Sequence, residues 1–97
     1  MHKLVPALLV LAGACSTAPA EPPIHGVTPG HKCEAAGTDQ FIGRVGDSTN
    51  GAAIMRTSHA AVLRWAPPGV MLTMDYREDR VTVHLGADGK ITAIKCG

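Results

Sequence analysis

The stretch RVTVHLGADGKITAI, residues 80–94, has the clearest structural pattern in the chain. Residues 80–85 alternate apolar and polar side chains, which is typical of a half-buried strand. The GADG run at 86–89 predicts a tight turn, and the run ITAI at 91–94, which is mostly β-branched, predicts a returning strand. The stretch therefore predicts a β-hairpin.

Two further elements lie upstream of this hairpin. Residues 61–65, AVLRW, predict a strand that the Pro-Pro-Gly run at 67–69 ends. Residues 50–58 predict a short helix, with Ser48 or Thr49 as its N-cap. This order of elements predicts a small wedge-shaped α+β domain, with one helix packed on a mixed sheet of three or four strands.

The connection between the strands at 61–65 and 80–85 is too long for a hairpin turn and too apolar for an ordinary solvent loop. Within it, Met74 stands between Thr73 and Asp75, and Arg77 and Arg80 follow shortly after. Arginine presents a rigid fork of donors that can hold side-chain and backbone oxygens in place. Such contacts would make an exposed loop stiff and would present Met74 to solvent.

The residues alone favour a different interpretation of this connection. Residues 70–74 are apolar enough to form another buried strand, with the two arginines simply solvated. We also expect Met71 to pack inward, beneath the rest of the loop.

Composition limits the classes of function. The chain has 97 residues, a formal net charge of +1 and 3% aromatic residues. Its length allows one domain, and its charge excludes the strongly basic profile of a nucleic-acid-binding protein. Serine, histidine and aspartate are all present, but no Gly-x-Ser-x-Gly motif occurs and the domain is too small for a deep pocket. We expect neither an enzyme nor a cofactor.

The N-terminus has the pattern of an export signal. Residues 1–14 combine a short positive head with an apolar run, and the run LAGAC at 11–15 resembles the bacterial lipobox. That resemblance implies lipid on Cys15, an outer-membrane lipoprotein facing the periplasm, and no membrane contact other than the lipid. Ordinary signal-peptidase cleavage after Ala20 is the alternative, and would give a soluble periplasmic or secreted protein.

Export also bears on the other cysteines. If Cys15 carries lipid, Cys33 and Cys96 remain as one pair in an oxidising compartment. A disulfide between them would staple the two ends of the folded part; the alternative is two free thiols.

Residues 15–32, which follow the signal at 1–14, are rich in proline and predict an extended tether ahead of a folded domain at 33–97. His25, His31 and Cys33 lack the fourth ligand and the compact spacing of a metal site, so we expect no metal.

The run GVMLTMDYREDRV, residues 69–81, resembles the reactive loop of the potato inhibitor I family of serine protease inhibitors. The framing Cys33, the ending Cys96-Gly97 and the export signal are more similar to the bacterial and fungal family of small elastase inhibitors. Residues 41–44 also resemble the segment before the single helix of the potato inhibitor I family, and residues 61–65 resemble the strand that leads into its loop. Together, these resemblances cover about two-thirds of the chain.

The resemblance implies inhibition by substrate-like insertion of loop 69–80 into a serine protease of chymotrypsin/elastase or subtilisin type, by a monomer. Met74-Asp75 matches the scissile bond, and Arg77 and Arg80 match supporting positions. Thr82 stands where the plant members carry a second supporting arginine. The remaining reactive-loop positions are Val70, Met71, Leu72, Thr73 and Tyr76. A non-inhibitory envelope lipoprotein, acting as a structural or binding module, is the alternative.

Overall fold

A computed structural model of the chain describes residues 24–97. The predicted signal segment 1–14, the lipidation site Cys15 and the alternative cleavage after Ala20 lie outside the described residues. Within residues 24–97, no helix has the length and apolar character needed to cross a membrane.

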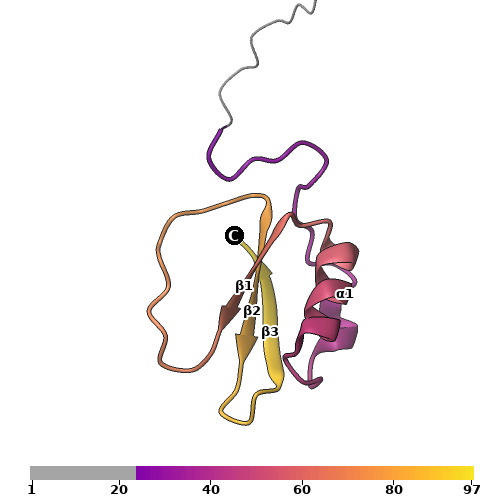
Figure 1. Cartoon of the computed structure of the whole chain (residues 1–97), viewed down its shortest axis with the longest axis vertical. Helices are drawn as coiled ribbons and strands as arrows, with labels where there is room; N and C mark the ends of the chain where they lie inside the picture. The colour runs from indigo at the N-terminus through magenta and orange to yellow at the C-terminus, as the bar shows by residue number, and fades with distance from the viewer. Residues whose placement is uncertain (1–23) are drawn as a thin grey trace, which may run out of the picture.

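The described part contains one α-helix, one short 3₁₀ helix and three strands (Figure 1). In chain order these are η1 Thr38–Phe41, α1 Ser48–Ser58, β1 Val62–Ala66, β2 Arg80–Leu85 and β3 Ile91–Cys96. The strands lie in the order β1-β2-β3, with β1 parallel to β2 and β2 antiparallel to β3. The prediction of an α+β domain with one helix on a mixed sheet is confirmed.

The predicted hairpin is formed by β2 and β3. Its turn is closed by the Gly86 amide, which donates to the Lys90 carbonyl at 2.8 Å, and Gly89 adopts a left-handed φ of 78°. Glycine reaches that conformation without the steric cost of a side chain. The second strand continues to Cys96, two residues beyond the predicted end, because Lys95 and Cys96 pair with β2.

Helix α1 begins two residues earlier than the predicted range 50–58. Asp47, and neither Ser48 nor Thr49, is the N-cap, and its carboxylate accepts from the Asn50 amide at 2.8 Å. Inside the helix, a Cβ on Gly51 would lie 2.9 Å from the Trp65 ring. The glycine that weakens the helix therefore lets it approach β1 closely.

The core lies between α1 and the inner face of the sheet. Ile54 of α1, Val81 and Val83 of β2 and Ile91 of β3 are each at most 1% exposed, and Phe41 of η1 closes one end. Val81 and Val83 thus face the core, as the alternation predicts. The other face of β2 is also buried at Arg80 and Thr82, so the strand is not half-buried there.

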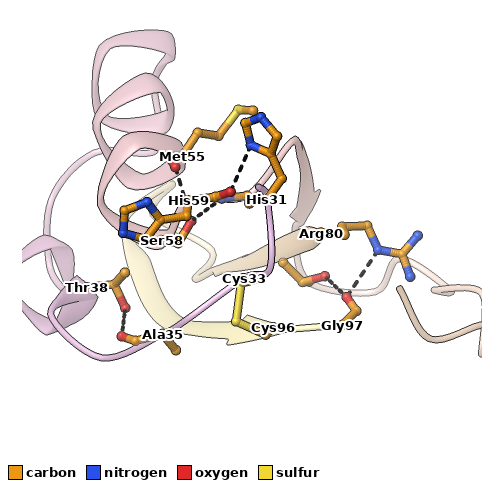
Figure 2. Close-up of a disulfide and its surroundings, with 12 residues drawn as sticks. His31, Cys33, Ala35, Thr38, Met55, Ser58, His59, Arg80, Cys96 and Gly97 are labelled. Carbon is orange, nitrogen blue, oxygen red and sulfur yellow. Dashed lines mark hydrogen bonds between the residues drawn. A yellow bond between two sulfur atoms is a disulfide. The ribbon is translucent and has the colours of Figure 1, made fainter. Parts of the chain in front are cut away.

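A disulfide joins Cys33 to Cys96, as predicted, with 5.6 Å between the two Cα atoms (Figure 2). The Cys33 amide also donates to the Glu78 carbonyl at 2.7 Å. In the chain-entropy model, a loop of this length can contribute about 4 kcal/mol at most to the stability of the fold. The disulfide links the segment before η1 to the end of β3, and the hydrogen bond from Cys33 links the same segment to the region just before β2.

Residues 24–32 depart from the predicted extended tether. The Val27 amide donates to the Ile24 carbonyl at 3.0 Å, and the His31 amide donates to the Thr28 carbonyl at 2.9 Å, so the segment contains two tight turns. The expectation is wrong for these residues because the glycines within the turns adopt positive φ and the segment finds hydrogen-bond partners on the folded domain.

Candidate functional site

The connection between β1 and β2, residues 67–79, is called the crossover loop here. Parallel neighbours cannot be joined by a tight turn, so the chain must return to the start of the next strand. In this protein it does so without a helix: the crossover loop forms a wide arc on the other side of the sheet from α1 (Figure 1). The path is therefore extended backbone that stands away from the core.

The crossover loop carries large side chains into solvent. Met74 is 96% exposed and Met71 93% exposed, while Val70 and Tyr76 are at least half exposed. Leu72 is the one half-buried residue among these reactive-loop positions. The expected inward packing of Met71 and the alternative of a buried strand at 70–74 are both wrong, because the loop bows away from the sheet.

On the N-terminal side of Met74, the loop is held by an arginine from β1. The Arg64 Nη1 group donates to the Thr73 hydroxyl at 3.1 Å and approaches the Thr73 carbonyl at 3.4 Å. The same guanidinium donates through Nε to the Thr82 hydroxyl at 3.2 Å. One fork of donors thus links the loop to both strands of the parallel pair.

On the C-terminal side of Met74, Arg80 holds the backbone of Asp75. Its Nη2 group donates to the Asp75 carbonyl at 2.7 Å and lies 3.8 Å from the carboxylate. Its Nε group donates to the Gly97 carbonyl at 3.1 Å, a contact drawn in Figure 2. Because Arg80 is only 7% exposed, this charge is fixed between the loop and the chain terminus.

The Asp75 carboxylate is held in its ionised form. Hydrogen bonding to the Thr73 hydroxyl is the largest cause, followed by the contact with His25, and the Arg80 charge adds to both. Together these lower the pKa of Asp75 from 3.8 to about 2.

The profile of the peptidase inhibitor I78 family matches residues 33–97, which include the sheet, the helix, the disulfide and the crossover loop. The chain belongs to the peptidase inhibitor I78 family. A solved structure described as the elastase inhibitor AFUEI is similar at a TM-score of 0.50 and 22% identity, over 62% of this chain and 82% of that one. This similarity shows that the two proteins share a fold. No curated protein sequence matches the chain significantly.

Within this I78 domain, Arg77, predicted as a loop support, hydrogen-bonds through its guanidinium to Asp79 at the base of the loop. It pairs with Asp79 through two hydrogen bonds, Nε to Oδ1 at 3.0 Å and Nη2 to Oδ2 at 3.1 Å. Arg77 first, then the Thr28 hydroxyl, lower the pKa of the fully buried Asp79 carboxyl from 3.8 to about 2. This ion pair stabilises the base of the loop instead of the exposed bond.

Thr82 occupies the position at which the family resemblance leads us to expect a second arginine. Its hydroxyl accepts from Arg64 and donates to the Gly97 carbonyl at 2.9 Å. Arg64 and Thr82 are register partners in the parallel pair, so the missing guanidinium is supplied by the neighbouring strand. Sequence reasoning missed Arg64 because the register of two strands far apart in sequence is not visible in either one.

In the structure, His25, His31 and Cys33 each have a different partner. Cys33 is in the disulfide, His25 contacts Asp75, and His31 contacts the His59 carbonyl at 3.0 Å. No group of three potential metal ligands occurs within residues 24–97.

Proposed function

We propose that this I78 inhibitor blocks serine proteases by inserting the crossover loop into the active site as a substrate, with Met74-Asp75 as the scissile bond. The observation that carries the proposal is the pairing of exposure with restraint: Met74 is 96% exposed, and both of its neighbours are bound by buried or half-buried arginines. The resemblance of residues 69–81 to a known reactive loop supports the same bond.

Restraint before docking supports tight binding. An extended loop that is already ordered loses little conformational entropy when it enters a cleft, so its contacts with the protease are retained as affinity. A flexible loop of the same sequence would bind less tightly and would be cleaved as a substrate.

Restraint after cleavage explains inhibition. Attack of the protease serine on the Met74 carbonyl carbon breaks the bond to the Asp75 nitrogen and leaves an acyl-enzyme with a new amine on Asp75. Arg80 holds the residue that bears this amine, and Arg64 holds Thr73 on the acyl side. The amine therefore stays in place, and re-formation of the peptide bond competes with attack by water.

The disulfide adds a covalent restraint to the same step. Cys33 lies before the proposed scissile bond and Cys96 lies after it, so cleavage at Met74-Asp75 leaves the two fragments joined. Joined fragments re-form a bond without the entropy cost of bringing two molecules together.

The chemistry of Met74 indicates the class of protease. Its side chain is unbranched, uncharged and polarizable, and suits the apolar primary pockets of chymotrypsin, elastase and subtilisin types. A pocket lined by an acidic residue would favour lysine or arginine instead.

Exchange of Met74 for lysine tests this proposal. Met74→Lys should weaken inhibition of chymotrypsin, pancreatic elastase and subtilisin by about a hundredfold and create inhibition of trypsin. Met71→Lys is the matched control, because Met71 is equally exposed on the same loop and lies three residues from the proposed bond. Equal effects of the two variants in titrations of inhibitor against enzyme would place the reactive bond elsewhere.

We also propose that the chain is exported and lipidated on Cys15. The apolar run, the lipobox-like residues and the disulfide, which persists in oxidising compartments, support this. The intact mass of the mature protein tests it, since a mature chain beginning at Cys15 with added lipid differs from one cleaved after Ala20.

A further inference from the structure

The segment at residues 24–28 lies outside the match to the I78 family, which begins at Cys33, yet it contacts the crossover loop. Its docking site is the C-terminal half of the loop, on the side of Asp75 and Asp79. These contacts add to those that the loop makes with Arg80 of β2 and with the Val62 amide of β1. We call residues 24–28 the N-terminal brace.

Three hydrogen bonds connect the N-terminal brace to the loop. The Asp79 amide donates to the Gly26 carbonyl at 2.9 Å, and the Thr28 hydroxyl donates to the buried Asp79 carboxylate at 2.6 Å. His25 Nε2 donates to the Asp75 carboxylate at 3.1 Å. The first two bonds satisfy buried polar groups at the base of the loop, and the third reaches the residue that follows the proposed scissile bond.

The contact is also sterically close. A Cβ on Gly26 would lie 2.9 Å from the Cα of Arg77, so only glycine lets the brace lie this near the loop backbone. Gly26 is buried and has a φ of +79°. Gly30 has the same φ of +79°, but a Cβ there would meet nothing within 4 Å. The two glycines therefore share backbone strain but differ in contact with the loop.

We propose that the N-terminal brace is a positioning segment of the inhibitory loop, acting on the amine side of Met74-Asp75, so that the functional inhibitor begins near residue 24 and not at Cys33. This inference rests on the proposed function. The brace acts on the backbone at Asp79 and on the side chain of Asp75. Both contacts restrain the fragment whose new amine must not leave after cleavage.

The pair Gly26→Ala and Gly30→Ala tests the brace in the full chain. In both variants the alanine must adopt the same positive φ, so the backbone strain is matched. A difference between the two variants in cleavage rate therefore reports the contact with Arg77. With subtilisin in excess, Gly26→Ala should raise the rate of cleavage at Met74-Asp75 about tenfold, whereas Gly30→Ala should change it less than about twofold. Mass spectrometry under reducing conditions measures the cleaved fraction.

A second pair of variants distinguishes the proposed role of the brace from a general loss of folding. His25→Ala removes the contact with Asp75, and His31→Ala removes a histidine whose partner is the His59 carbonyl, away from the loop. Only His25→Ala should shift the ratio of cleaved to intact inhibitor at equilibrium toward the cleaved form. Equal ratios for both variants, together with equal cleavage rates for the two glycine variants, would overturn the proposal.

The two proposals fail in different ways. A wild-type chain that inhibits none of the three proteases contradicts the proposed function, whatever the variants do. Amide exchange then still tests the brace, because exchange at the Asp79 amide should be faster in Gly26→Ala than in Gly30→Ala. A wild-type chain that inhibits, with four variants that behave identically, contradicts only the role of the brace.

Discussion

The two halves of the crossover loop are restrained very differently. The leading half, residues 67–74, is largely exposed and is attached to the sheet through one arginine, Arg64, at Thr73. The trailing half, residues 75–79, is bound by Arg80, by the N-terminal brace and, at Glu78, by the backbone of Cys33. The strong restraints therefore lie on one side of Met74.

This asymmetry fits the chemistry of a cleaved and religated bond. The acyl half stays covalently bound to the protease during the reaction, so few hydrogen bonds from the inhibitor are needed to keep it in place. The amine half is free to leave and must be held by the inhibitor. The structure concentrates its hydrogen bonds where the departing group would be.

The largest effect should follow from loss of the trailing restraint at Arg80. Arg80→Ala removes the donor to the Asp75 carbonyl and to Gly97, and should convert the chain from an inhibitor into a substrate, with cleavage after Met74 about a hundredfold faster. Mass spectrometry with and without reductant follows the cleavage. Arg56→Ala, on the exposed side of α1, should leave the rate unchanged. Slow cleavage in Arg80→Ala would mean that the trailing half is held without it.

A smaller effect should follow from loss of the leading restraint. Arg64→Ala frees Thr73 but leaves the trailing half intact, so the inhibition constant should rise about tenfold, which corresponds to ~1.4 kcal/mol. Arg64→Lys should recover little, because lysine cannot bind Thr73 and Thr82 with one rigid fork. An effect of Arg64→Ala larger than that of Arg80→Ala would reverse the proposed asymmetry.

The smallest effect should come from lowering the pH, which should reduce the stability of the fold. The pKa of both Asp75 and Asp79 is lowered from 3.8 to about 2 in the folded protein, so each ionised carboxylate stabilises the fold above about pH 4. That stabilisation should disappear as the pH falls from about 4 to about 2. Both groups lie in the trailing half, whereas the clamp between Arg64 and Thr73 uses oxygens that do not titrate in this range.

Thermal unfolding between about pH 2 and about pH 6 measures this acid effect. Asp79→Asn should flatten the dependence of the melting temperature on pH, and Asp39→Asn, an exposed carboxyl on η1, should leave it intact. A steep dependence that survives in Asp79→Asn would assign the acid sensitivity to other groups.

Much of the architecture could be predicted from local patterns. Alternation at 80–85, the glycine turn at 86–89 and the cysteine count led to the hairpin and the disulfide, because each of these features depends on neighbours in sequence or on residue type alone. Arg80 was expected among the loop supports because it follows the loop directly, and it contacts the loop backbone.

Other features could not be predicted because they depend on residues distant in sequence. Arg64 supports the loop because β1 and β2 pair in parallel with Arg64 beside Thr82, a register that neither strand specifies. Arg77 was expected as a loop support, but its partner, the buried carboxylate of Asp79, could not be named from the sequence. The segment at 24–32 has the composition of a tether, and its turns follow from contacts that a local pattern does not contain.

Sequence pattern was thus enough for the elements and for the pairing of Cys33 with Cys96, whereas the exposure of Met74 was expected only from the family resemblance. The elements and the pairing depend on periodicity, turn chemistry and residue type, which are local properties. The folded arrangement assigned the restraints, because a hydrogen bond to the loop requires a donor at the right distance, whichever part of the chain supplies it. Arg64 and the N-terminal brace became loop supports through that proximity.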